Sequence, residues 1–209
     1  MQNTCYLSTA YLAPVSYYVC LANFNDVFIE NHETFAKQSY RNRCGIYTAN
    51  GVLNLSIPVN AANHSLIKEV KIDNSKNWQR QHWRSIMSAY NASPFFIYYD
   101  YELQPFYEKS FNYLLDFNNE IQQKLLSLLN FSVKITPTSD FEKSLNKDLD
   151  FRQLIHPKKN SLFNLQEYNQ VFNDKHGFIP DLSILDLLFN QGPESTSYLL
   201  SSVDDFAKA

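Results

Sequence analysis

The sequence predicts an α/β fold: a single domain in which a mixed, largely parallel sheet is flanked by helices and followed by a helical C-terminal half. Three observations support this prediction. Residues 5–30 alternate strand-like, helix-like and strand-like segments, which is the βαβ rhythm of a parallel sheet. Residues 75–129 carry apolar side chains at spacings typical of amphipathic helices. The 209 residues, 44% of them hydrophobic, suffice for one core, so we expect one domain over residues 1–209.

The N-terminal unit is predicted as a strand, a helix and a second strand. Apolar residues predict strands over Cys5–Ala10 and Asp26–Glu30. Between them, Val15–Phe24 is apolar on nearly every side, which predicts a short buried helix. Pro14 suits the first turn of that helix, because its fixed φ angle is already helical.

A hairpin and a further strand are expected next. Extended character resumes over Ile46–Thr48, and Asn50-Gly51 supplies the positive φ angles that a tight turn needs. Val52–Val59 alternates between apolar and polar side chains, which predicts a half-buried strand. The shorter alternation over Ile67–Ile72 predicts another strand.

Helices dominate the middle of the chain. Helical spacing predicts one helix over Ser75–Tyr90, capped by Ser75, and others over Glu102–Phe117 and Ile121–Leu129. Phe131–Thr136 is predicted as the closing strand. The core-facing side of the first of these helices is expected to carry Gln79, Trp83, Ile86, Met87 and Tyr90.

The C-terminal part is less regular. Residues 137–164 are polar and poorly patterned, which indicates a long loop or small excursion and not a second domain. A helix is predicted over Pro180–Asn190, with Asp181 and Ser183 as cap candidates. Gly192 is placed to end it.

The composition excludes several classes of protein. The net charge of −3 argues against a dedicated nucleic-acid binder, which normally has a strongly basic surface. Cys5, Cys20 and Cys44 match neither a disulfide framework nor a zinc spacing, which indicates reduced thiols in a cytoplasmic protein. No segment resembles a signal peptide or approaches the ~18 apolar residues needed to cross a bilayer, so we expect no membrane insertion.

A polar segment, residues 31–46, leaves the end of the second predicted strand, where α/β domains usually place their ligands. Lys37, Arg41 and Arg43 form a cationic cluster there, which we interpret as a clamp for phosphate or carboxylate. Tyr40 and Asn42 are further candidate ligand contacts. The alternative is a solvated loop with ordinary surface charges.

Histidines are the candidate bases. His32 directly follows the second strand beside Glu33, and a histidine suits the removal of a proton near neutral pH. His82, on the helix over residues 75–90, is the second candidate, and His176 is a weaker one. A structural role is the alternative for each histidine.

The same helix adds candidate ligand contacts. Trp78 would stack on a base or sugar ring. Arg80 and Arg84 would extend the anion site, or would form the solvated face of the helix.

Absent motifs restrict the chemistry. The chain lacks GxGxxG, P-loop, GxSxG, HExxH and paired CxxC motifs, and it contains four glycines. A phosphate must therefore be held by side chains or by a helix N-terminus. The spacing of His, Cys, Asp and Glu suggests no metal site, and the sequence names no cofactor.

Several blocks, spanning most of the chain in order, resemble the WbqC-like protein family. They are residues 11–18 (YLAPVSYY), 32–44 (HETFAKQSYRNRC), 50–59 (NGVLNLSIPV), 77–86 (NWQRQHWRSI), 89–96 (AYNASPFF) and 170–189 (QVFNDKHGFIPDLSILDLLF). Other members open with Gln-Pro-x-Tyr-Leu-Pro-Trp, whereas residues 8–14 here read STAYLAP.

The resemblance implies a role in O-antigen or other surface-polysaccharide biosynthesis. The protein would be a cytoplasmic transferase that modifies a nucleotide-linked amino sugar by acyl or aminoacyl transfer. Its partner would be a small phosphorylated or carboxylate ligand, and no nucleic acid. The alternatives are a non-catalytic binding or assembly protein that uses the same clamp, and a structural protein whose basic loop is only surface.

Overall fold

A three-stranded parallel sheet forms one side of the molecule. The computed structural model describes residues 4–141 and 150–202. Strands β1 (Thr4–Ser8), β2 (Asp26–Glu30) and β7 (Lys134–Pro137) lie in the order β1-β2-β7, and both pairings are parallel. Their carboxyl ends therefore meet along one edge of the sheet.

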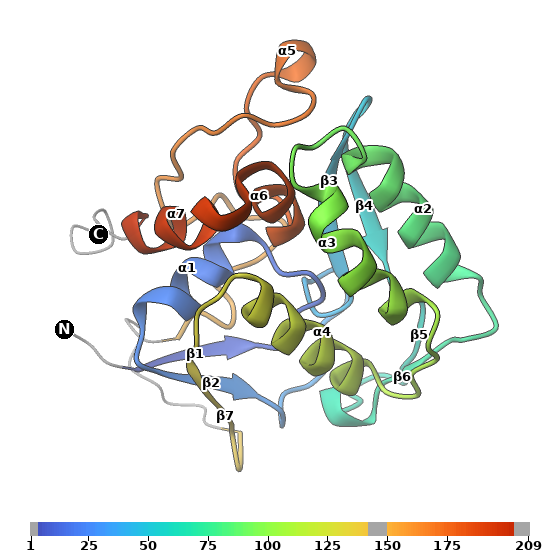
Figure 1. Ribbon diagram of the computed structural model, residues 1–209. Helices are drawn as coiled ribbons and strands as arrows, with labels where there is room; N and C mark the ends of the chain where they lie inside the picture. The colour runs from blue at the N-terminus through green and yellow to red at the C-terminus, as the bar shows by residue number, and fades with distance from the viewer. Residues whose placement is uncertain (1–3, 142–149, 203–209) are drawn as a thin grey trace.

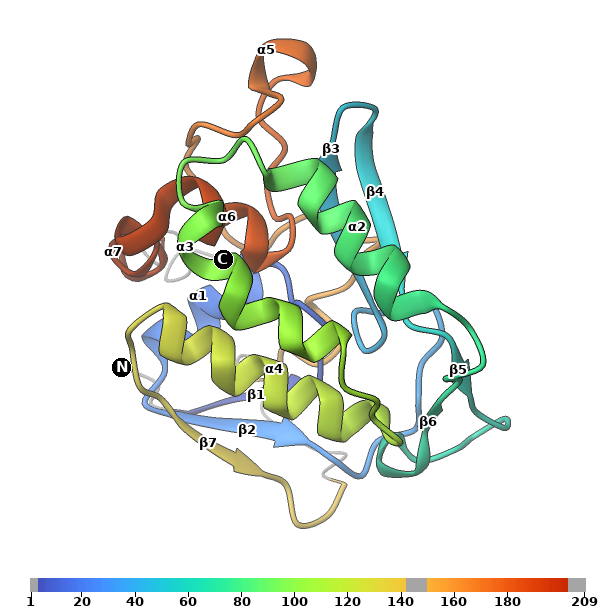
Figure 2. The same cartoon turned by 45° about the vertical axis from the view of Figure 1, so that its right-hand side comes forward.

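Two helices cover one face of this sheet. Helix α1 (Val15–Asn23) connects β1 to β2, and α4 (Leu114–Leu128) precedes β7. Both connections step in the same direction across the sheet, so right-handed crossovers place α1 and α4 on the same side, as Figures 1 and 2 show. The sheet residues buried in the core are Cys5, Leu7, Val27 and Ile29.

An antiparallel hairpin stands apart from the parallel sheet. Strands β3 (Arg43–Thr48) and β4 (Gly51–Ser56) pair around the predicted Asn-Gly turn, and helix α2 (Trp78–Tyr90) packs on β3 (Figure 1). The two faces of the hairpin differ in burial. Cys44, Ile46 and Leu55 lie in the core, whereas Asn54 and Ser56 are exposed. The hairpin thus presents an outer face to solvent.

Short elements complete the fold. The second pair of strands is β5 (Val59–Asn60) with β6 (Lys71–Ile72), and a 3₁₀ turn, η1 (Ile67–Glu69), lies between them. The remaining helical elements are α3 (Phe96–Leu103), η2 (Gln104–Tyr107), α5 (Asn173–His176), α6 (Ile184–Gln191), η3 (Gly192–Glu194) and α7 (Ser195–Ser201).

The predicted fold class is confirmed: the structure is α/β, with a parallel sheet, flanking helices and a mostly helical C-terminal part. The predicted strand over Asp26–Glu30 is confirmed to the residue, and α1 differs from its prediction by one residue. Ser183 caps α6 by accepting from the Leu185 backbone N–H, and Gly192 ends that helix with a φ angle of 52°.

Two predicted elements are wrong. No single helix spans Glu102–Phe117: α3 ends at Leu103, Pro105 occupies a 3₁₀ turn, and α4 starts only at Leu114. Proline lacks the N–H that a continuous helix requires, which explains the break. The predicted strand over Ile67–Ile72 is mostly a 3₁₀ turn.

Ser75 does not cap α2. Its hydroxyl donates to Asp73 Oδ1 at 2.6 Å, and the helix begins three residues later.

The irregular region after β7 returns to the sheet. Residues 142–149 of the predicted 137–164 loop lie outside the described residues. Asp150 then forms a parallel bridge with Tyr6 of β1, and the Phe151 N–H donates to the Tyr6 carbonyl at 2.9 Å. In the described part of the chain, no helix is long and apolar enough to cross a membrane.

Candidate functional site

A buried ion pair lies at the carboxyl ends of β1 and β2. Arg41 donates from Nε to Glu33 Oε1 at 2.7 Å, and its Nη2 contacts both Glu33 Oε2 and Ser8 Oγ. Arg41 is 3% exposed and Glu33 is 4% exposed. The guanidinium is therefore neutralised inside the protein, and Arg41 does not form the open anion clamp predicted from the sequence.

A second buried pair lies beside it, and sequence reasoning missed it. Arg152 Nη1 donates to Glu30 Oε2 at 2.9 Å, and Arg152 Nε and Nη2 donate to the two carboxylate oxygens of Asp150. Thr138 donates to the other Glu30 oxygen at 2.7 Å. This network of hydrogen bonds links residues 150–152 to the carboxyl ends of β2 and β7.

The two arginines border a very small cavity. It measures about 10 Å³ and is lined by Ser8, Tyr17, Tyr40, Arg41 and Arg152, among others. A volume of roughly 10–15 Å³ holds a single water molecule. A ligand must therefore bind outside this cavity, and the two ion pairs serve to fix the ends of the strands.

The N-terminus of α1 is also occupied from within the protein. Asp181 accepts hydrogen bonds from the Ser16 backbone N–H at 2.7 Å and from the Ser16 hydroxyl at 3.0 Å. The Val15 N–H donates to the Leu182 carbonyl at 2.9 Å. The helix end that often receives a phosphate in α/β folds is filled by a carboxylate in this protein.

A groove runs along the outer face of the β3–β4 hairpin. Its volume is about 900 Å³, within the range of roughly 300–1,000 Å³ typical of small-molecule sites. The hairpin forms its floor, and residues 157–167 and 178–182 form its sides. Residues that line it include Tyr40, Gly45, Asn54, Lys159, Phe163 and Phe178. Tyr40 also lines the small cavity, so the groove adjoins the carboxyl ends of the strands.

One cation of the groove lining, Lys159, belongs to a set of basic residues whose charges act on His156. Burial lowers the pKa of the His156 ring, and the charges of Lys158, Lys159, Arg41 and Arg43 lower it further. Arg43 Nε is buried and has no hydrogen-bond partner in the described structure. Among residues 4–141 and 150–202, no carboxylate pairs with Arg43, Lys158 or Lys159.

His156 was not identified from the sequence. Its Nδ1 accepts a hydrogen bond from the Lys158 backbone N–H at 3.2 Å. In the neutral ring, the proton therefore resides on Nε2, which is a hydrogen-bond donor. The signal available in the sequence was the run His156-Pro-Lys-Lys, in which two lysines follow a histidine.

His82 lies in the core and not in a site. It is 5% exposed, its Nδ1 is 2.9 Å from the Tyr11 hydroxyl, and it also bonds to the Ser56 backbone. Burial lowers its pKa to about 4. Because protein groups engage both ring nitrogens, the predicted role of His82 as a base is not supported.

Trp78 is also a core residue. It is 2% exposed, and its ring packs edge-on against His82, Tyr107 and Phe117. It therefore offers no face on which a ligand could stack. Trp83, which was expected in the core, is the more exposed of the two tryptophans.

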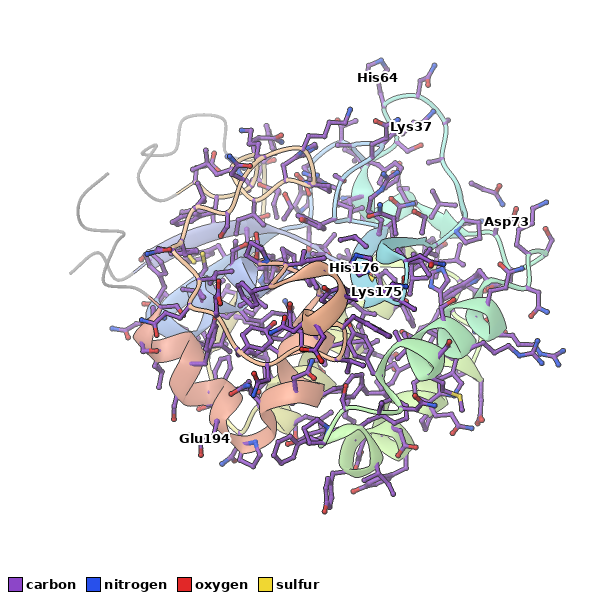
Figure 3. All side chains as sticks on the ribbon, turned by 90° about the horizontal axis from the view of Figure 1, so that it is seen from above. Lys37, His64, Asp73, Lys175, His176 and Glu194 are labelled. Atoms are coloured by element: carbon purple, nitrogen blue, oxygen red, sulfur yellow. The ribbon has the colours of Figure 1, made fainter. Side chains whose placement is uncertain are left out.

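The other predicted cations do not converge. Lys37 is exposed near the outline of the molecule (Figure 3). Arg80 and Arg84 are exposed on α2, and Arg84 borders a separate surface hollow beside Thr48 and Asn50. Of the three cations in the predicted clamp, Arg43 lies on the same face of β3 as the groove residue Gly45, and no carboxylate pairs with it among the described residues.

The remaining predicted residues have varied surroundings. His32 is half-buried after β2, with Nδ1 3.5 Å from Lys68 Nζ. Asn42 exchanges hydrogen bonds with Ile57, which is a structural contact, although its Oδ1 is buried without a partner. His176 and Lys175, labelled in Figure 3, both contact the Ala49 carbonyl at the hairpin tip.

No metal centre is built from the described residues, where no group of three or more His, Cys, Asp or Glu side chains could hold an ion. The three cysteines are free and buried.

Comparison with known proteins identifies the family. The model of the WbqC-like protein family matches residues 9–161 and 158–198. The chain belongs to the WbqC-like protein family. This WbqC-like chain is also similar to the uncharacterized protein Rv1507c of Mycobacterium tuberculosis, with 25% identity over 230 aligned residues that cover 95% of this chain and 98% of the relative. No solved structure matches the chain.

Proposed function

We propose that this WbqC-like protein is a transferase that modifies a nucleotide-linked amino sugar, by acyl or aminoacyl transfer, in surface-polysaccharide biosynthesis. One observation carries the proposal: a groove of suitable size adjoins the carboxyl ends of the parallel strands, Lys159 lines it, and Arg43 shares a face of β3 with the groove residue Gly45. Glu167 and Asp181 also line the groove, so the positive charge would come from Lys159 and the neighbouring Arg43, which favour a ligand of opposite charge. A diphosphate group supplies that opposite charge.

Particular groups would contact the diphosphate. Arg43 and Lys159 would neutralise it, because the guanidinium forms paired hydrogen bonds to phosphate and the ammonium acts as a point charge. The Nε2–H of His156 and the Tyr40 hydroxyl would donate further hydrogen bonds. The Tyr40 hydroxyl has no hydrogen-bond partner within the described residues, and burial keeps its pKa above the ordinary value.

The reaction would join an amine to an acyl carbon. The amine nitrogen attacks the carbonyl carbon of an activated acyl donor, a new C–N bond forms, and the bond to the donor's leaving group breaks. The amine proton passes to a base, and the leaving group departs with a proton. His32 is the candidate base, because it follows β2 at this edge of the sheet and is partly accessible.

Calorimetric titration with nucleotide sugars, free nucleotides and acyl-coenzyme A compounds tests the binding step. We expect a nucleotide sugar to bind, and Lys159→Ala to weaken binding about tenfold, which is roughly 1.4 kcal/mol. Arg80→Ala is the matched control, because it removes an exposed cation that does not line the groove. Equal losses from both variants would contradict the proposed site.

A turnover assay separates a transferase from a binding protein. The purified protein is incubated with the bound nucleotide sugar and an acyl donor, and the product is sought by mass spectrometry. We expect His32→Asn to keep the affinity and lose turnover. A ligand that binds without conversion by any acyl donor would favour a non-catalytic binding protein.

A further inference from the structure

We infer that the outer face of the β3–β4 hairpin binds the nucleoside of the ligand, with Gly45 as the residue that makes room for its ring. This inference rests on the proposed function, since it assigns a second part of the same ligand to a second part of the groove. Gly45 and Asn54 were not among the candidate site residues predicted from the sequence, and neither takes part in the buried ion pairs at the strand ends.

Strand β3 carries both Gly45 and the cation Arg43 on this face. Arg43 and Gly45 are two residues apart in β3, so they share one face of the strand. With a rise of roughly 3.3 Å per residue, their Cα atoms lie about 6–7 Å apart. That separation allows one ligand to place phosphates at Arg43 and a ring over Gly45.

Gly45 is not required by the backbone. Its φ angle lies outside the left-handed region, unlike those of the other three glycines. A Cβ built at this position would lie 3.2 Å from Val52 Cγ1 and 3.9 Å from both Asn54 Oδ1 and Leu182 Cδ2. Glycine inside a strand costs roughly 0.5–1 kcal/mol relative to alanine and often marks a close approach of another group, which at Gly45 includes the Val52 side chain.

The groups around this opening suit a nucleobase. Asn54 is directly opposite Gly45 in the pairing register, and its exposed amide has no protein partner among the described residues. An amide offers both donors and an acceptor to the edge of a base. The aromatic side chains of Tyr40 and Phe178 also line the groove, and aromatic rings pack favourably against a planar ring.

The test uses two probes and calorimetry: a nucleoside diphosphate and inorganic pyrophosphate. We expect the wild-type protein to bind the nucleoside diphosphate about tenfold or more tightly than pyrophosphate. Gly45→Val should remove that preference and leave pyrophosphate binding unchanged, because it fills the space above Gly45 and leaves Arg43 and Lys159 in place. Leu53→Val, on the opposite face of the same hairpin, is the matched control and should change neither affinity.

The outcomes separate the two proposals. Equal affinity of the wild-type protein for both probes, or an unchanged preference in a folded Gly45→Val protein, would overturn the nucleoside site while the anion site stands. No binding of either probe would overturn both. If Gly45→Val does not fold, Asn54→Ala replaces it and should likewise weaken the preference for the nucleoside diphosphate. Hydrogen exchange over residues 43–56 of the wild-type protein is then measured with and without the nucleoside diphosphate. This probe should protect these amides, and absent protection would refute the inference.

Discussion

Asp181 holds the first turn of α1 through both of its carboxylate oxygens, which bond to Ser16 from 165 positions away in the sequence. The sequence suggested Asp181 as a cap for the nearby helix α6, and the structure assigns it to α1 instead. Asp181 adopts a φ angle of 56°, so its placement is a special feature of the loop before α6.

Replacement of Asp181 by alanine should lower the free energy of unfolding by about 1–2 kcal/mol, the usual value for a lost helix cap. Burial raises the pKa of Asp181 from 3.8 to about 6. A raised native pKa favours folding at low pH, and this contribution is lost as the pH rises through about 6. Urea unfolding should therefore show a larger deficit for Asp181→Ala at pH 5 than at pH 7.5, and equal deficits would contradict the assignment.

Breaking the buried pair of Arg41 and Glu33 should destabilise the protein strongly. Arg41→Met or Glu33→Gln alone should cost about 3–5 kcal/mol, because each leaves a charge buried without its partner. The double variant should cost less than the sum of the two single variants. Chemical denaturation of the four proteins measures this coupling. The exposed pair Lys109 and Glu120 is the control, with an expected coupling below about 1 kcal/mol.

His82 should make the native state sensitive to acid. Burial lowers its pKa from 6.5 to about 4, so the unfolded chain binds more protons between these values and stability falls as the pH drops from about 6.5 to 4. The loss attributable to this residue is about 3 kcal/mol at most. Urea unfolding of His82→Gln should show a smaller loss of stability over this range than the wild-type protein, and parallel pH profiles would contradict the buried neutral imidazole.

Anion binding in the groove should be coupled to proton uptake. Burial and the cations around His156 lower its pKa in the free protein, and a bound diphosphate would raise it again by opposing those charges. Calorimetry near pH 6 in two buffers of different ionisation enthalpy should show net uptake that disappears in His156→Gln. Binding with no uptake, or with release of protons, would place the anion elsewhere.

Replacement by alanine should cost different amounts of stability at two glycines that have positive φ angles. A Cβ at Gly192 would lie 2.5 Å from the Phe95 ring, whereas a Cβ at Gly177 would meet no atom within 4 Å. Gly177→Ala should cost about 1 kcal/mol through backbone strain alone, and Gly192→Ala should cost clearly more because the aromatic ring must also move. Thermal denaturation compares them directly. Equal costs would show that Phe95 yields without penalty.

The sequence predicted correctly those helices, strands and turns whose signals lie within a few neighbouring residues. The apolar runs of β1 and β2, the short helix between them and the Asn-Gly turn all have signals within a few residues, and Gly51 has the expected positive φ angle of 90°. The break at Pro105 was also visible in the sequence, but the apolar spacing on both sides of it was read as one helix.

The buried face of α2 shows why side-chain roles were harder to predict. The core-facing residues are Trp78, His82, Ile86, Ala89 and Tyr90, whereas Met87 is 43% exposed. The aromatic and polar residues of this helix permit two rotations about its axis, and only packing against Tyr11 and Phe117 selects one of them. A buried histidine and tryptophan were therefore mistaken for ligand contacts.

The groove had no local signal at all. Its floor comes from residues 40–54, and its sides come from residues 157–167 and 178–182, which the fold brings together from distant parts of the chain. Arg41 was expected to be free because composition does not show that a guanidinium turns inward to Glu33. The segment from residue 31 to residue 46 was correctly placed at the end of β2, yet the roles of its cations depended on contacts outside it.

The pairing of Tyr6 with Asp150 has a consequence for assembly. An outer strand of a sheet exposes unpaired backbone groups to which a strand of another molecule can add. Residues 150 and 151 cover the middle of that edge of β1, at Tyr6. The opposite edge belongs to β7, which is four residues long, carries Lys134 and ends at Pro137. Short length, lysine and proline all discourage such addition. Both edges of the parallel sheet thus carry features that discourage two copies of this protein from joining these sheets edge to edge.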